Sequence, residues 1–171
     1  MRNYHISVIA VVSVLLFTIN CFALEDAQIT QLMKTANSGE VDAAKLAVKN
    51  SKNPSVKTFA EKMVKEHTEN GEKVKTLSKD EKIKMSSSDD EKKLKADTKE
   101  KMKGLKKAKE NDFDKAYMGT QVAMHQELLD KLDTKLIPEA RNPALKSYLQ
   151  ETRAHVQNHL NDAKTIQNEL Q

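Results

Sequence analysis

Apolar residues recur at helical spacing along most of the chain beyond residue 25 and define four long amphipathic segments. Positions three and four apart share one face of a helix, so each segment carries one continuous apolar stripe. Asparagine is a good N-cap and proline suits the first helical turn, so an Asn-Pro pair marks the start of the second and of the fourth segment. The predicted helices cover residues 26–50, 54–79, 111–137 and 143 to nearly the C-terminus.

The connection between the second and third helices is long, and it is more polar and richer in lysine than the helices that it joins. Residues 80–90 are polar and are expected to form a loop. Residues 91–109 carry nine lysines against three acids and few large apolar residues, which predicts a shorter helix beside or across the others. Two helical hairpins joined by one long connection are typical of ferritin-like proteins. The sequence therefore predicts an all-α fold, a ferritin-like antiparallel four-helix bundle with an extra short helix in the crossover between helices two and three.

The first 23 residues have the pattern of a secretory signal peptide. Arg2 is followed by an apolar run over residues 6–19, and Cys21-Phe22-Ala23 supplies small residues at the expected cleavage point. The run is too short for a comfortable membrane span, which needs about 20 apolar residues. Residues 1–23 are thus predicted to be a signal peptide and residues 24–171 a single helical domain, without a stable membrane span after cleavage.

Export of this kind predicts a periplasmic protein, secreted through the inner membrane. The alternative of a lipoprotein acylated on Cys21 is disfavoured by Asn20, which stands where such signals carry Gly, Ala or Ser. Removal of the signal also removes the only cysteine, so the domain is expected to fold without a disulfide. We expect a monomer or homodimer whose partner in the envelope is unknown.

Composition excludes several classes of function. Positive and negative charges are nearly balanced, with a formal net charge of +4, and few aromatic residues accompany the lysines, so nucleic acid is not an expected partner. No glycine-rich phosphate loop and no cysteine nucleophile outside the signal are present, and no organic cofactor is expected. No catalytic set of residues emerges, which favours a non-enzymatic role and leaves an enzyme open.

Each long helix has one strong metal-ligating or proton-transferring residue on its apolar stripe. The four are Glu40, His67, His125 and His159. Glu40 lies 14 residues before Pro54 and His67 lies 13 after it, and the other two flank the second Asn-Pro pair at similar distances. At about 1.5 Å per residue, partners in an antiparallel hairpin are then staggered by only a few ångströms. The four side chains are predicted to meet at one level of the bundle.

One carboxylate with three imidazoles suits a transition metal. The set favours zinc, copper, iron or nickel over calcium and magnesium, which prefer oxygen ligands. His155, one turn from His159, is a further partner or an alternate ligand, ranked behind because it lies lower in the bundle. Met63 and Met124 lie close to two of the histidines and suit copper(I), although methionine is common core filler.

Three interpretations of the polar cluster are open at this stage. It binds one transition-metal ion, for sensing, buffering or stress protection. Alternatively it is a hydrogen-bonded network in a structural or interaction protein of the envelope, because buried charges need partners of this kind. A third interpretation is a small metalloenzyme acting on peroxide or superoxide.

Six short motifs occur in order along the chain: Glu40-Val41, residues 56–60, Met63-Val64 with His67, Phe113-Asp114 with Tyr117, Gln121-Val122 with His125, and His159-Leu160. Together they resemble the Domain of Unknown Function 4142 family of exported bacterial proteins. The resemblance implies a ferritin-like bundle in the periplasm or envelope and supplies no established activity. Di-iron members of the wider ferritin-like class use Glu-x-x-His pairs, whereas here Glu151 stands four residues from His155 and Glu66 is adjacent to His67, which favours a mononuclear site.

Overall fold

The computed structural model describes residues 24–170, apart from the side chains of residues 110 and 111, and all the regular secondary structure in this range is helical. The predicted all-α fold is confirmed, while the predicted signal peptide, residues 1–23, lies outside the described residues. The elements are α1 (Asp26–Asn50), α2 (Pro54–Asp80), α3 (Asp89–Lys107), α4 (Glu110–Lys131), the π-helical turn η1 (Leu132–Leu136), α5 (Ile137–Glu139) and α6 (Pro143–Glu169).

The helix starts follow from local side-chain chemistry. Asn53 and Asn142 each accept hydrogen bonds from backbone amides of the first turn, so both predicted Asn-Pro starts are confirmed. Ser88 closes the polar loop after α2 and caps α3 in the same way. The third long helix begins at Glu110 rather than at Asn111, and the side chain of Lys109, which precedes it, makes no capping hydrogen bond.

The predicted third helix also changes its winding near its end, which the sequence pattern did not indicate. Residues 132–136 form a π-helical turn that ends two residues before Pro138. Proline has no amide hydrogen to donate to the carbonyl group four residues earlier, so the α-helical ladder is interrupted here and a wider turn takes its place.

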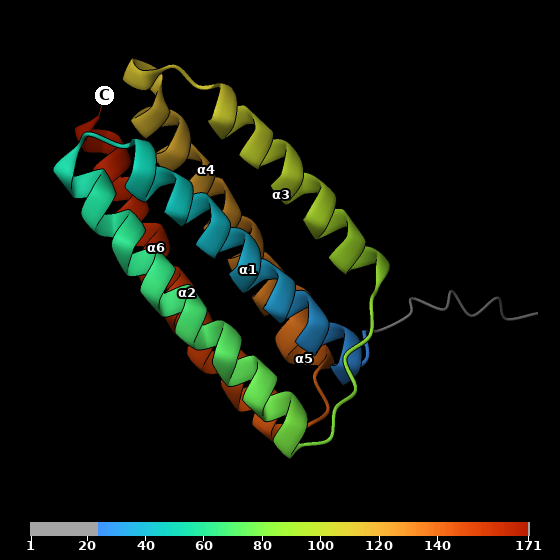
Figure 1. Cartoon of the computed structure of the whole chain (residues 1–171). Helices are drawn as coiled ribbons and strands as arrows, with labels where there is room; N and C mark the ends of the chain where they lie inside the picture. The colour runs from blue at the N-terminus through green and yellow to red at the C-terminus, as the bar shows by residue number, and fades with distance from the viewer. Residues whose placement is uncertain (1–23, 171) are drawn as a thin grey trace, which may run out of the picture.

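The long helices form two antiparallel hairpins that pack against each other (Figure 1). The first hairpin is α1 with α2, and the second is α4 with α6. Further contacts join α2 to α6 and α1 to α4, and α3 runs along α1 and α4 on one side of the molecule. α3 lies close to α1 at Gly39, where an added Cβ would lie 2.8 Å from Cγ2 of Thr98.

The core consists of two apolar clusters with a polar layer between them. In α2 and α4 the buried polar residues lie along the chain between the two sets of apolar residues, and Asn37 and Glu40 do so in α1. In α6, Thr152 and His159 lie among apolar residues of the first cluster. The first cluster includes Ile29, Val74, Leu132 and Leu149, and the second includes Ala44, Met63, Tyr117 and Ala163. The polar layer contains Asn37, Glu40, His67, Gln121, His125, Thr152 and His159.

Within the described part of the chain, no helix combines the length and the apolar character that a membrane crossing requires.

Candidate metal centre

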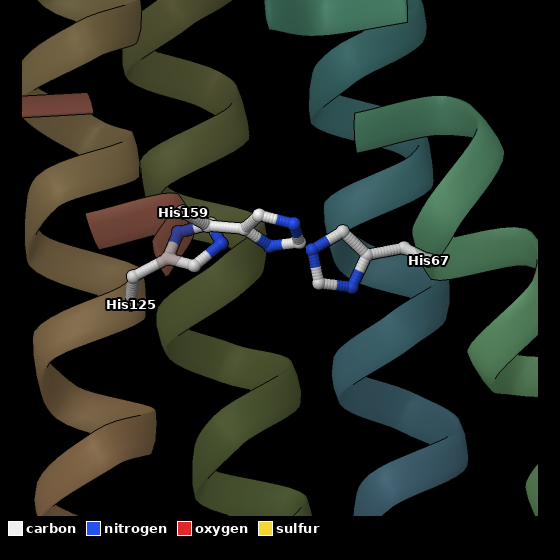
Figure 2. A group of neighbouring side chains, drawn as sticks. All are labelled: His67, His125 and His159. Carbon is white, nitrogen blue, oxygen red and sulfur yellow. The ribbon is translucent and has the colours of Figure 1, made fainter. Parts of the chain in front are cut away.

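Three histidines from three different helices meet in the polar layer. His67 of α2, His125 of α4 and His159 of α6 point toward one another (Figure 2). Their exposed fractions are 5%, 1% and 3%, and their ring centroids are 5.3 to 5.6 Å apart. One ring nitrogen of each histidine lies within 4.8 Å of the corresponding nitrogens of the other two. The helices thus bring three imidazoles to a common point.

The outward nitrogen of His67 is held by a side-chain amide. His67 Nδ1 lies 3.0 Å from Oδ1 of Asn37. The orientation of that amide follows from its other end, because Asn37 Nδ2 donates to the backbone carbonyl of Met33 at 2.8 Å. Asn70 Nδ2 donates to the same Asn37 oxygen at 3.2 Å. The partner of His67 Nδ1 is therefore an oxygen, and this nitrogen carries the hydrogen of the neutral ring.

The outward nitrogens of the other two histidines also meet oxygen acceptors. His125 Nδ1 donates to the backbone carbonyl of Gln121, one turn earlier in α4, at 2.9 Å. His159 Nε2 donates to the carboxylate of Glu66, at 2.7 Å. A neutral imidazole has one N–H and one lone pair, so both rings carry their hydrogen on the outward side.

The remaining nitrogens, which face inward, have no partner. His67 Nε2, His125 Nε2 and His159 Nδ1 are buried and make no hydrogen bond to any described residue. Each is the acceptor nitrogen of its ring, since the other nitrogen donates outward. Three lone pairs therefore converge at one buried point, where a positive charge is the natural complement.

The environment keeps the rings of His67 and His159 neutral. Burial, reinforced by His125 and His159, holds the pKa of His67 well below its ordinary value. Burial also lowers the pKa of His159, to about 4, against the opposing effect of the Glu66 hydrogen bond. At neutral pH the lone pairs of both rings are thus available, as metal ligation requires.

The spacing fits a first-row metal after a small contraction. With metal–nitrogen bonds of about 2.0–2.1 Å, tetrahedral geometry places ligand nitrogens about 3.3 Å apart. From a separation of at most 4.8 Å, each nitrogen would need to move inward by less than about 1 Å. Side-chain rotations of this size require no change in the helices.

Glu40, the fourth residue predicted for the site, lies behind His125 and not beside the inward nitrogens. It is 4% exposed, and its Oε2 accepts a hydrogen bond of 2.9 Å from Nε2 of Gln121. Its Oε1 is 3.7 Å from Nδ1 of His125, the outward nitrogen. The structure therefore brings three of the four predicted residues together and places Glu40 where it can orient one of them and offset its charge.

Two residues that hold the histidines escaped the sequence reasoning. Asn37 lies on the buried line of α1, three residues before Glu40, so a polar residue on the stripe was a usable signal. Glu66 lies in the middle of α2, beside its buried stripe, with its side chain 32% exposed. Its partner, His159, is 93 residues away in the sequence, so no local pattern indicates the pair. Met63, by contrast, belongs to the second apolar cluster and has the surroundings of core filler.

Comparisons with known proteins bear on the fold and the family. Residues 20–166 match a family described as "Domain of unknown function (DUF4142)", in agreement with the resemblance found in the sequence. Among solved structures, the chain is similar to "CopM in the Cu(II)-bound form", with a TM-score of 0.67 and 12% identity over 88% of this chain and 100% of that one. At this identity the likeness concerns the fold alone. No curated protein matches the sequence.

Proposed function

The chain belongs to the DUF4142 family, and we propose that it binds one divalent transition-metal ion through His67, His125 and His159. The bound ion serves metal buffering or sensing in the cell envelope. The architecture that we propose for this role is a ferritin-like four-helix bundle, exported to the periplasm by a signal peptide at residues 1–23.

The observation that carries the proposal is the hydrogen-bond pattern of the three rings. A purely structural network would place a donor between the inward nitrogens, since buried polar atoms are normally paired. Here every ring donates outward, and the three inward nitrogens are acceptors only. This arrangement is the one found in metal sites, where an oxygen behind each histidine fixes its tautomer and orientation.

Charge supports a divalent ion. Three neutral imidazoles leave the charge of the ion uncompensated, and burying such a charge is expensive. Glu66 lies behind His159 and Glu40 behind His125, so two carboxylates stand one hydrogen bond or slightly more from the ligands. Two negative charges match Zn²⁺ or Cu²⁺, and imidazole ligands disfavour Ca²⁺ and Mg²⁺.

Copper is the first metal to test. Nitrogen sites bind Cu²⁺ more tightly than the other divalent first-row ions, and a protein of the same fold is described in a Cu(II)-bound form. Three protein ligands leave one coordination position open, which suits an ion that is taken up and released.

The deciding experiment measures metal content and affinity in protein purified without chelators or a histidine tag. We expect close to one equivalent of copper or zinc, and a melting temperature that EDTA lowers. His125→Ala should abolish stoichiometric binding. The matched control is Asn158→Ala, an exposed position beside His159 on α6, which should bind metal like the wild type.

The proposal would be contradicted by protein that is purified without metal and whose melting temperature changes neither with EDTA nor with added ions. The cluster would then be structural, with His125→Ala costing about 1–3 kcal/mol of stability alone.

A further inference from the structure

A cleft between α2 and α6 connects the surface to the buried histidines. Its volume is about 240 Å³. The outer part is lined by exposed residues that include His155 and Glu69, the middle by half-buried Glu66, and the inner end by buried His67 and His159. Two of the three proposed ligands therefore border a path that opens to solvent.

The other large cavity near the polar layer does not offer such a path. It has a volume of about 530 Å³, lies among α1, α3 and α4, and reaches Glu40. None of the three histidines lines it, and its walls include Leu32, Ala36 and Leu128. Carboxylates of Asp90, Asp97, Glu127 and Asp130 also line it, but an ion there would reach only Glu40, which lies behind His125. The cleft between α2 and α6 is therefore the better route.

His155 occupies a special position in the cleft. It is exposed and lies four residues before His159 on the same helix, so the two side chains project from one face of α6. Histidines at this spacing are a common chelating pair on helices. His155 is also close enough to the site for its charge to contribute to the lowered pKa of His67.

The two ring nitrogens of His159 face different surroundings. Nδ1 faces the other two histidines, while Nε2 faces Glu66, a residue of the cleft. Rotation of the His159 ring, with loss of the hydrogen bond to Glu66, would turn Nδ1 and its lone pair toward the cleft. The return of the ring to its hydrogen bond with Glu66 directs Nδ1 inward again.

We infer that a divalent transition-metal ion reaches the central site through this cleft, and that His155 and His159 hold it transiently on the way in and out. The inference rests on the proposed function, because it describes how the same site is filled and emptied. Glu66 and Glu69 line the cleft together with Lys65 and Lys73, so the lining carries no net charge, and the groups that attract the ion are the imidazoles and the carboxylate of Glu66 beside His159. His155 is then a residue of the uptake path and not a ligand of the stored ion.

Stopped-flow kinetics test the path directly. Transfer of Zn²⁺ and of Cu²⁺ from a chromophoric chelator to the full chain, and back again, gives the rate constants of uptake and release. For His155→Ala and His155→Gln we expect both rate constants to fall about tenfold, while their ratio, the dissociation constant, stays within about twofold of wild type. Asn158→Ala, on the same helix and outside the cleft lining, controls for general effects of substitution on α6.

The possible outcomes separate this inference from the proposed function. Unchanged rates in both His155 variants would overturn the path while leaving the central site intact. A dissociation constant weakened tenfold or more would also overturn it, because His155 would then ligate the stored ion. A wild-type chain that takes up neither metal would overturn the proposed function, and the path with it.

Discussion

At the scale of single residues, three kinds of oxygen atom hold the three histidines. They are a side-chain amide behind His67, a backbone carbonyl behind His125 and a carboxylate behind His159. The backbone carbonyl belongs to the helix itself, so no substitution removes it. The other two partners are side chains and can be removed one at a time, which allows the contribution of each to be measured.

Removal of the carboxylate behind His159 should weaken metal binding without removing a ligand. For Glu66→Ala we expect the affinity to fall about 10- to 100-fold, because the ring loses the contact that fixes its tautomer and the site loses a negative charge. Glu66→Gln keeps an oxygen acceptor for His159 Nε2 and should lose less. Competition titration against a chelator of known affinity measures both. Equal affinities for Glu66→Ala and wild type would show that the hydrogen bond does not organise the site.

Glu40 provides a second test at this scale, since the sequence placed it among the ligands. Its carboxylate faces Gln121 and the outward side of His125, so Glu40→Gln should retain binding with a loss of less than about tenfold. His125→Ala in the same titration should bind no stoichiometric metal. Loss of binding in Glu40→Gln as complete as in His125→Ala would restore Glu40 to the ligand set.

The limits of sequence reasoning at this scale have a simple cause. Helical periodicity assigns a residue to a face, and it placed Glu40 and the three histidines correctly in the buried layer. It says nothing about side-chain rotamers, so it could not tell that Glu40 lies behind His125. Glu66 was beyond reach for another reason, because its partner His159 comes from a different hairpin and the pairing depends on how the two hairpins pack.

At the scale of the elements, the chain offers two contrasting glycines in neighbouring helices. Gly104 lies in α3 with no atom within 4 Å of an added Cβ, whereas a Cβ at Gly39 of α1 would lie 2.8 Å from Thr98 Cγ2. Both positions are helical, so both would gain from alanine on propensity alone. Only the first can gain without disturbing the contact between α1 and α3.

The comparison of the two glycines measures how firmly α3 is packed. We expect Gly104→Ala to raise the free energy of unfolding by roughly 0.5–1 kcal/mol, the usual helix gain of alanine over glycine. Gly39→Ala should gain less or become destabilising, and adding Thr98→Ala should recover part of the difference. Urea denaturation of the single and double variants gives these values. Equal gains at both positions would mean that Thr98 moves aside freely and that α3 is only loosely held.

Helix starts were predictable to within about two residues, but the π-helical turn near the end of the third long helix was missed. The two Asn-Pro starts were found because capping is local chemistry that a few adjacent residues specify. The π-helical turn at residues 132–136 was not found, since Leu132 and Leu136 keep the apolar spacing of an ordinary helix. Pro138 indicates an interruption, but whether the chain kinks, stops or widens depends on packing around it.

At the scale of the whole molecule, the polar layer divides the core and makes the free energy of unfolding depend on protonation. His67 and His159 are neutral in the folded state and protonate more readily in the unfolded chain, because burial lowers the pKa of both. A metal that binds only the folded protein adds stability by mass action and competes with protons for the same nitrogens. Acid should therefore lower the free energy of unfolding in two ways, by protonating the histidines of the unfolded chain and by displacing bound metal.

Mild acidification of the metal-free protein should lower its stability before the carboxylates contribute. The folded pKa of His159 is about 4 and that of His67 lies well below its ordinary value, against an unfolded value near 6.5. Between these limits the unfolded chain binds more protons, so stability is full above about pH 6.5 and falls as the pH drops toward 4. We expect about 1–2 kcal/mol to be lost per histidine by pH 5.

Chemical denaturation at pH 7.5, 6 and 5, with and without Zn²⁺, tests this expectation. Carboxylates with lowered pKa values, such as Glu91 at about 2, lose their contribution only below their unfolded value near 4.5, so the interval above pH 5 isolates the histidines. His159→Gln should flatten the profile of the metal-free protein, since one neutral buried imidazole is gone. Zn²⁺ should raise wild-type stability at pH 7.5 and steepen its fall toward pH 5. A wild-type profile that is flat from pH 7.5 to 5 would mean that the rings protonate as easily in the folded protein as in the unfolded chain, and that the centre is open to water.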